Sequence, residues 1–548
     1  MKKLLALLLS LVLIFTFSAC NSGNNSDSSS KDKSSSSSQG SVNNQNPIPD
    51  NLFEYTFTDA DYDKYITSLN NLKTSAISGN SKDDVIKYRD ESENLSNYLS
   101  TQNQIANVIY YAENTEEASN HYEKIEKLLT QAAAEYYRIY RDIYTSNSAF
   151  KDIVFEGWTT EEIRSLANLD VNEFIRTRDA LSDILLEFNA LDDSKSNWAS
   201  TVNSLYYEHV TEANNQAKAW GYSNYYDYMS ENGYSRDYSA SDRQNFRKYV
   251  KEYIVPAYDE CYSAIRRLTI TQTDLNEFNR ISNTAYDKLE TDYVKGFIST
   301  FDGSIKQKME AMFDGKHIRF GTKDSLEAAF TAYLPYYDQS VVFLSDGYYK
   351  STSTTVHEMG HFVSLYNYDY SATSYDLLET HSQGSEWLLL YYLKDHMSKG
   401  AYKIKVVDEI ATLYDLMIRC AIIDEFEETV YKALIPYQPS EYDDLIERIC
   451  QKYGSNVNQS LGIDNYLKHV IIRSPVYYIS YATSAISAAN FYVKALDEGY
   501  EAAQESYRKL QEGNKDEGFL YNLEYAGLPS PFKSETYVNL CNKFSTLY

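Results

Sequence analysis

The sequence predicts a mostly α-helical protein. Only 9 of its 548 residues are proline and 20 are glycine, so residues that break helices are scarce. Apolar residues recur at spacings of three and four from Ala118 to Tyr136 and again from Val407 to Val430, as on the buried face of an amphipathic helix. No short-period repeat stands out. We therefore expect a succession of amphipathic helices.

The N-terminus is expected to be a targeting segment and not part of the fold. A basic start, an apolar run over residues 4–17 and a small-residue end predict a signal peptide in residues 1–19. Cys20 resembles the acylated cysteine of a bacterial lipoprotein, which implies a lipid anchor in the extracellular face of the bacterial cell membrane. Residues 20–51, rich in Ser and Asn, predict a disordered tether. A retained transmembrane helix is the alternative, although the apolar run is short for a span of about 20 residues.

The rest of the chain is long enough for a large core and, by length, two or three domains. The polar run Asp192-Asp-Ser-Lys-Ser196 interrupts the helical pattern and places a boundary near Lys195. We expect an N-terminal helical domain over residues 52–195 and a second domain over residues 196–548. One large helical body fits the length equally well.

Charge and cysteine usage exclude some classes of function. The net charge is −27 and no basic stripe is present, which argues against binding to nucleic acid. An evenly solvated acidic surface explains the charge more simply than attraction for cationic peptides. Four cysteines lie beyond Cys20 without C-x-x-C spacing, so no cysteine metal site is expected, and disulfides and free buried thiols both remain open. They are Cys261, Cys420, Cys450 and Cys541.

Residues 339–345, Gln-Ser-Val-Val-Phe-Leu-Ser, predict a short β-strand. They are largely β-branched or aromatic, and the turn signal Asp346-Gly347 follows them. We interpret this segment as an edge strand. The alternative is a buried strand, since Val341 to Leu344 are contiguous apolar residues and do not alternate with polar ones.

The next segment, Thr355-Val-His-Glu-Met-Gly-His361, indicates a metal site. On a helix, His357 and His361 lie one turn apart and can reach one metal ion. Glu358 would flank the open side of that metal, where a carboxylate can take a proton from water whose pKa the metal lowers to about 7. An amphipathic helix with two hydrogen-bonded histidines is the alternative if no third ligand follows.

A third ligand is expected in the helical segment from Tyr375 to Leu390, because catalytic zinc usually takes three protein ligands. Our choice is Glu379. Glu386 lies two turns further on the same side, where it can hydrogen-bond a ligand from outside. His381 points about 200° away from Glu379 around the helix and is the alternative ligand.

These two motifs carry a resemblance to the thimet oligopeptidase and oligoendopeptidase F group of zinc metallopeptidases. Glu379-Thr-His-Ser-Gln-Gly-Ser-Glu386 fits the E-x-x-S-Q-x-x-E pattern of that group. Other stretches similar to oligoendopeptidase F relatives are Leu205-Tyr-Tyr-Glu-His-Val210, Ala217-Lys-Ala-Trp-Gly-Tyr-Ser-Asn-Tyr-Tyr226, Arg236-Asp-Tyr238 and Asp424-Glu-Phe-Glu427. The resemblance runs over roughly residues 200 to 530. It implies a large helical zincin-type metallopeptidase with a small β-sheet beside the metal site, a deep substrate channel and one Zn²⁺ per chain.

The segment Ser474 to Ser484 looks like the tyrosine-rich segment of that group, in which phenol hydroxyls bind the developing oxyanion. A phenol donates a strong hydrogen bond and stays neutral at pH 7, since its pKa is about 10. Tyr477 and Tyr481 share a helical face and are our choice, and Tyr478 competes with them. Because the chain has 54 tyrosines, simple core packing is the alternative for such a cluster.

Two positions depart from the pattern of the group. Relatives often read H-E-x-G-H-x-x-H, and this chain has Ser364 in place of the last histidine. Relatives also carry a histidine shortly before the tyrosine segment, where Ile471 stands here. Either that histidine is lost, or the register shifts by two residues and His469 serves.

The resemblance thus implies a zinc endopeptidase that hydrolyses short unstructured peptides at the cell surface. His357, His361 and Glu379 would hold zinc, Glu358 would be the general base, and a tyrosine would stabilise the oxyanion. In zinc peptidases of this type, a strand such as residues 339–345 pairs with the substrate backbone, which implies a substrate-binding role for Val342, Phe343 and Leu344. The alternative function is an inactive peptide-binding lipoprotein that feeds an importer. The intact Glu358 separates the two, because a pure binder has no use for it. The sequence carries no prediction of the oligomeric state.

Overall fold

The computed structural model describes residues 47–79, 81–282, 292–345, 352–366, 374–514 and 517–548. The predicted signal peptide, Cys20 and the turn Asp346-Gly347 lie outside these residues. Within the described part of the chain, no helix combines the length and the apolar character needed to span a membrane.

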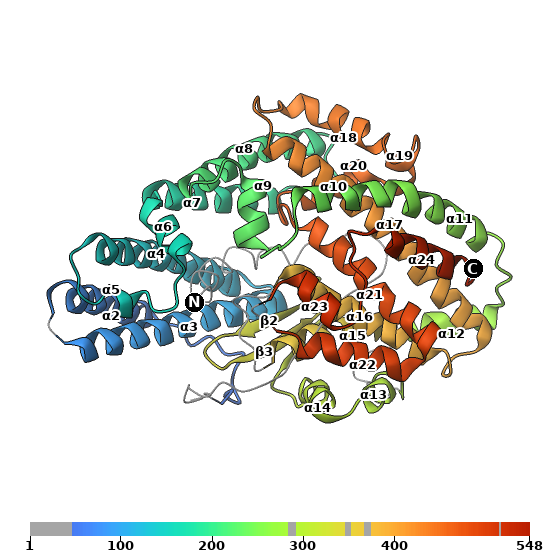
Figure 1. Ribbon diagram of the computed structural model, residues 1–548, viewed down its shortest axis with the longest axis horizontal. Coiled ribbons are helices and arrows are strands. Elements are labelled where there is room, and N and C mark those ends of the chain that lie inside the picture. Colours follow the sequence, from blue (N-terminus) through green and yellow to red (C-terminus); the bar gives the residue numbers. More distant parts are fainter. Residues whose placement is uncertain (1–46, 80, 283–291, 346–351, 367–373, 515–516) are drawn as a thin grey trace.

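The fold is mostly α-helical, as predicted. The N-terminal helices α2, α3 and α4 pack on one another, and Figure 1 shows them at one end of the molecule. The helix predicted from Ala118 to Tyr136 is the centre of α4, which begins after Thr115, whose hydroxyl accepts from the Ala118 amide. The helices of this region are α2 (Asp59–Ser78), α3 (Lys82–Glu113), α4 (Glu116–Thr145), α5 (Lys151–Val154), α6 (Thr160–Asn168) and α7 (Val171–Asn189).

The rest of the chain is also helical, apart from one sheet. The predicted boundary at Lys195 falls in the turn between α7 and α8, and these two helices pack against each other. Before the sheet come α8 (Trp198–Ala219), α9 (Tyr225–Tyr228), η2 (Met229–Gly233), α10 (Ala240–Tyr249), η3 (Val250–Ile254), α11 (Val255–Ile265), α12 (Gln272–Ser282), α13 (Asp292–Ser299) and α14 (Gly303–Ala311).

After the sheet, the helix predicted from Val407 to Val430 is part of α17. The elements here are α15 (Thr352–Leu365), α16 (Tyr375–Leu393), α17 (Lys399–Tyr431), η6 (Pro439–Glu441), α18 (Tyr442–Cys450), α19 (Val457–Leu461), α20 (Ile463–Val470), α21 (Tyr478–Glu498), α22 (Tyr500–Glu512), α23 (Phe519–Tyr525) and α24 (Ser534–Ser545). One apolar core extends from Phe57 to Phe544. The four cysteines beyond Cys20 are free thiols.

The sheet lies between α3 and α15 (Figure 1). Its strands are β1 (Ile318–Phe320), β2 (Ala329–Leu334) and β3 (Gln339–Leu344), in the order β1-β3-β2. β1 runs parallel to β3 and β2 runs antiparallel to it.

The prediction that residues 339–345 form an edge strand is wrong. β3 is the central strand, so its backbone groups bond to β1 on one side and to β2 on the other. Val342, Phe343 and Leu344 are fully buried, which agrees with the alternative interpretation of a buried strand. Because their backbone groups are already paired, these three residues cannot offer an edge to a peptide.

The face of the sheet toward α3 carries a second apolar cluster. Phe330 and Phe343 pack there against Ile105 and Val108 of α3. Ile48 is buried in the same cluster, although the composition assigned it to the tether. The fold therefore begins before Leu52, because an apolar residue near the end of the tether is covered by the sheet.

Three helices bring distant segments together beneath the sheet. α16 packs against both α15 and α21. The approach to α21 is close at Gly384, where an added Cβ would lie 2.8 Å from the Phe491 ring. The two motifs and the tyrosine segment therefore meet in the interior.

Candidate metal centre

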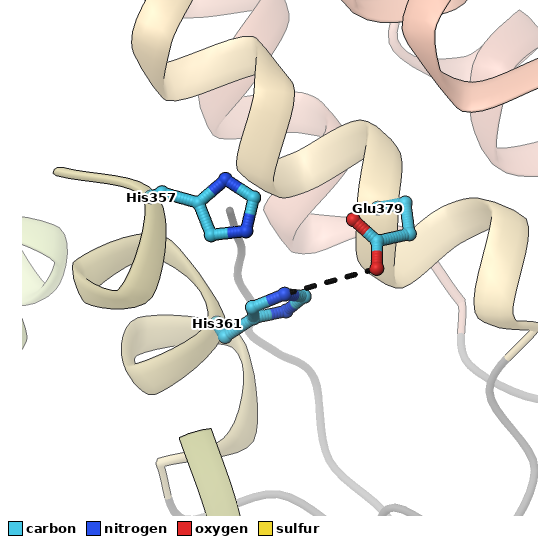
Figure 2. A group of neighbouring side chains, drawn as sticks. All are labelled: His357, His361 and Glu379. Carbon is cyan, nitrogen blue, oxygen red and sulfur yellow. Dashed lines mark ion pairs between the residues drawn. The ribbon is translucent and has the colours of Figure 1, made fainter. Parts of the chain in front are cut away.

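The structure brings the three predicted ligands together. α15 presents His357 and His361 on successive turns, with ring centroids 5.3 Å apart, and α16 presents Glu379 beside them (Figure 2). One ligand atom from each side chain lies within 4.8 Å of the other two, and His361 Nε2 is 4.0 Å from Glu379 Oε1. All three side chains are buried. Among the described residues, the group that could hold a metal ion includes Glu379 and not the alternative His381.

The protonation states of these groups fit a cation. Burial lowers the pKa of His361 to about 3, and burial together with the nearby His361 lowers the pKa of His357 well below its usual value. Both imidazoles are therefore neutral near pH 7. Burial raises the pKa of Glu379 to about 7, against hydrogen bonds that favour its charged form.

Two neutral imidazoles and one carboxylate are the ligand set of many catalytic zinc sites. A divalent cation also supplies the positive charge that a buried carboxylate needs to stay ionised. These residues therefore fit a zinc ion.

Glu358, the predicted base, lies next to the ligands and is held by the sheet. Its Oε1 is 3.8 Å from His357 Nε2. Thr331 of β2 donates its hydroxyl to Glu358 Oε2 at 2.7 Å and to the Glu358 carbonyl oxygen at 3.2 Å. Sequence reasoning missed Thr331, because its role depends on the order of the strands. The carboxylate is thus oriented by a residue that no motif includes.

Glu386 makes the contact predicted for it. Its Oε1 lies 3.4 Å from His357 Nδ1. A carboxylate at Nδ1 favours the tautomer with a proton there, which leaves Nε2 as the free lone pair for a metal.

Other residues of the second motif hold α16 in place. Ser382 donates to Glu379 Oε2 at 3.2 Å, and Ser385 donates to the Val356 carbonyl oxygen on α15 at 3.0 Å. Gln383 donates to the Tyr481 carbonyl oxygen at 3.3 Å. Ser382 and Gln383, the S-Q part of the motif, therefore align the ligand and tie its helix to α21, and Ser385 ties the helix to α15.

The tyrosine segment reaches the site through Tyr477. This residue precedes α21, and its hydroxyl donates to Glu379 Oε1 at 2.5 Å. The Tyr481 ring lies one turn further, with its centroid 5.8 Å from that of Tyr477. Tyr478 instead packs against Tyr466 of α20. The role of either Tyr477 or Tyr481 at the oxyanion stays a prediction.

The residues at the two positions that depart from the pattern make local contacts. Ser364 donates to the His361 carbonyl oxygen at 2.9 Å, within α15. The His469 ring packs against Trp198 of α8 in a tilted arrangement, with ring centroids 4.4 Å apart. Ile471 is buried.

No family model matches the sequence, and no curated protein matches it either. Solved structures share its fold at low sequence identity. PZ peptidase A, solved with an inhibitor, is 16% identical with a TM-score of 0.64, over 90% of this chain and 97% of that chain. A Bacillus anthracis str. Ames protein assigned as an oligoendopeptidase F is 16% identical with a TM-score of 0.67, over 91% and 97% of the two chains. A protein of Chlamydophila abortus assigned as a peptidase is 13% identical with a TM-score of 0.62, over 91% and 98%. The mostly helical fold with its small sheet is thus that of oligoendopeptidase F-like peptidases.

Proposed function

We propose that this protein is a zinc-dependent endopeptidase that hydrolyses short unstructured peptides. The observation that carries the proposal is the buried group of His357, His361 and Glu379 with Glu358 beside it. Its fold, shared with proteins named as peptidases, supports the same reaction class.

Each step of hydrolysis has a residue suited to it. A zinc ion held by the three ligands would polarise the scissile carbonyl and make water more acidic. Glu358 takes a proton from the attacking water and passes it to the amine nitrogen as the peptide bond breaks. The Tyr477 or Tyr481 hydroxyl donates a hydrogen bond to the carbonyl oxygen as it becomes negative.

The edge strand β2 replaces β3 as the proposed substrate strand. The Ser345 amide donates to the Ala328 carbonyl oxygen at 2.9 Å, so this pair is a hydrogen-bonded one. In an antiparallel ladder such pairs alternate with pairs that share no hydrogen bond. Ala329 and Thr331 belong to the second kind, so their backbone groups point away from β3. A peptide that adds to this edge is held by its backbone next to Glu358, whatever its side chains. Only an extended peptide can pair in this way, which favours unstructured substrates.

The proposed location is the extracellular face of the bacterial membrane, with a lipid on Cys20. It rests on the basic start, the apolar run and Cys20 of the sequence. Labelling of cells with a palmitate analogue tests it: the wild-type chain is expected to carry the label, and C20A is expected to lose it and leave the membrane fraction. Label retained by C20A would contradict the anchor.

The peptidase proposal is tested with the full chain, internally quenched peptides and a measured zinc content. E358Q keeps the shape of the side chain but cannot accept the proton, so a loss of about 10²- to 10⁴-fold in kcat is expected with about one zinc still bound. Full zinc without cleavage in the wild type would instead favour an inactive peptide-binding lipoprotein. If the wild type neither binds zinc nor cleaves any peptide, the site assignment itself is refuted.

A further inference from the structure

Val476, directly before Tyr477, has a left-handed backbone with φ of 62°. A β-branched residue rarely adopts this conformation, because its side chain crowds the backbone. Such strain persists only where the surroundings enforce it, and it is common at functional sites. The residue that follows is the tyrosine that bonds to Glu379.

Three side chains form hydrogen bonds to the backbone at this point. The Val476 amide donates to Glu427 Oε1 of α17 at 2.7 Å. The Val476 carbonyl oxygen accepts from Arg236 Nη2 at 2.5 Å. The Pro475 carbonyl oxygen accepts from the Tyr234 hydroxyl at 2.8 Å. Both polar groups of the strained residue are therefore held from outside its own segment.

Glu427 and Arg236 are themselves fixed. Glu427 is fully buried, and Arg236 is buried with its guanidinium over the Tyr234 ring, 4.5 Å from the centroid. Arg236 Nε also donates to Ser480 Oγ at 2.9 Å, and Ser480 donates to Asp376 Oδ2 at 2.9 Å. Asp376 lies three residues before Glu379 on α16. The support of Val476 is thus connected to the helix of the metal ligand.

α17 is anchored next to Glu427. Asp424 accepts from the Tyr226 hydroxyl at 2.5 Å and from Arg247 Nε at 2.6 Å. Residues 424–427 and 236–238 are two stretches that the sequence singles out and that the proposed reaction does not use. The structure brings Glu427 from the first and Arg236 from the second to the peptide group before Tyr477.

We propose that Glu427 and Arg236 are positioning residues, which hold Val476 in its left-handed conformation and so direct the Tyr477 hydroxyl at Glu379. A return of Val476 from φ of 62° to an ordinary helical value near −60° would rotate the chain by roughly 120° and move Tyr477 away. The consequence for catalysis rests on the proposed function. The consequence for metal binding does not, because Tyr477 bonds to Glu379 itself.

The test compares Zn²⁺ affinity, measured by competition with a chelator, across variants of the full chain. E427A removes the acceptor of the Val476 amide and is expected to weaken Zn²⁺ binding by about 10- to 100-fold, the usual effect of losing a group behind a metal ligand. Y477F is expected to weaken it to the same extent. E427A combined with Y477F is expected to match either single variant, because both act through one hydroxyl.

Two rescues separate positioning from a general structural role. E427Q keeps an acceptor oxygen and is expected to bind Zn²⁺ like the wild type. V476G adopts a positive φ without a side-chain penalty, so V476G is expected to restore affinity to E427A. The matched control is E425A, on the same helix, whose carboxylate pairs with Lys251 and Lys452; it is expected to leave Zn²⁺ affinity unchanged.

Several results would overturn the proposal: wild-type Zn²⁺ affinity in folded E427A, effects of E427A and Y477F that multiply, or no recovery with V476G. If E427A does not fold, R236K makes the same comparison, because lysine cannot reproduce the several bonds of the guanidinium. With saturating Zn²⁺, kcat is expected to fall in E427A with little change in KM. If the wild type cleaves no peptide, the proposed function fails, and the Zn²⁺ affinities still decide the positioning role.

Discussion

The hydrogen bond from Thr331 to Glu358 offers a direct test of how the proposed general base is oriented. T331V replaces the hydroxyl by a methyl group of similar size in a strand where valine is well tolerated. It removes the donor that lies 2.7 Å from Glu358 Oε2. A hydrogen bond to a charged group contributes about 1.5–3 kcal/mol, and about 1.4 kcal/mol corresponds to tenfold in rate. The same hydrogen bond also makes the carboxylate less basic, which offsets part of its benefit. We therefore expect the lower end of this energy range, a loss of about tenfold in kcat.

The assay measures kcat and KM on a quenched peptide with zinc content measured in parallel. T331S keeps the hydroxyl and is expected to stay near the wild type. Unchanged kcat in T331V at one zinc per chain would refute the reasoning. So would an equal defect in T331S, because T331S keeps the hydroxyl and its defect could not come from a lost hydrogen bond.

Three further predictions concern the metal, the packing and the effect of pH. Dialysis against a chelator is expected to abolish cleavage. One equivalent of Zn²⁺ is expected to restore cleavage in the wild type but not in H361A. Activity that survives metal removal would exclude the proposed reaction. G384A would place a Cβ 2.8 and 2.9 Å from ring carbons of Phe491. Overpacking costs about 1–3 kcal/mol, offset by about 1 kcal/mol of helix propensity, so the urea midpoint is expected to fall and to recover with F491L. Burial lowers the pKa of His209 to about 4 from 6.5, so on acidification the unfolded chain gains a proton before the native chain does. The contribution of neutral His209 to the free energy of unfolding is complete above pH 6.5 and is lost as the pH falls toward 4. The free energy of unfolding of the wild type should therefore drop by about 2 kcal/mol more than that of H209Q between pH 7 and pH 5.

Local pattern predicted much of the fold. The periodic segments became α4 and α17, and the segments around His357 and Glu379 became α15 and α16, because an apolar face at helical spacing is sufficient for a buried helix. Spacing within these helices also grouped His357 with His361 and put Glu386 behind a ligand. These relationships lie within one helix or between two motifs, and the sequence contains them directly.

Contacts between distant segments could not be predicted. Four contiguous apolar residues predict a strand but not its neighbours, so the prediction of an edge strand is wrong and β3 is central. The same limit hid Thr331, which reaches Glu358 only through the order of the strands. The conformation of Val476 has no local signal at all, because valine is among the residues least expected at positive φ.

The alternation of backbone groups along β2 has a consequence for how a ligand is recognised. Only every second residue of the strand, such as Ala329 and Thr331, directs its amide and carbonyl outward. A series of otherwise identical peptides, each N-methylated at one successive amide, should therefore inhibit with a period of two. Methylation at the amides that face β2 should abolish affinity, and methylation at the amides between them should be tolerated. The strand would bind only a peptide whose amide groups have the same spacing as its own. A peptide with one β-amino acid, whose backbone is longer by one methylene, should therefore pair with β2 on only one side of that residue.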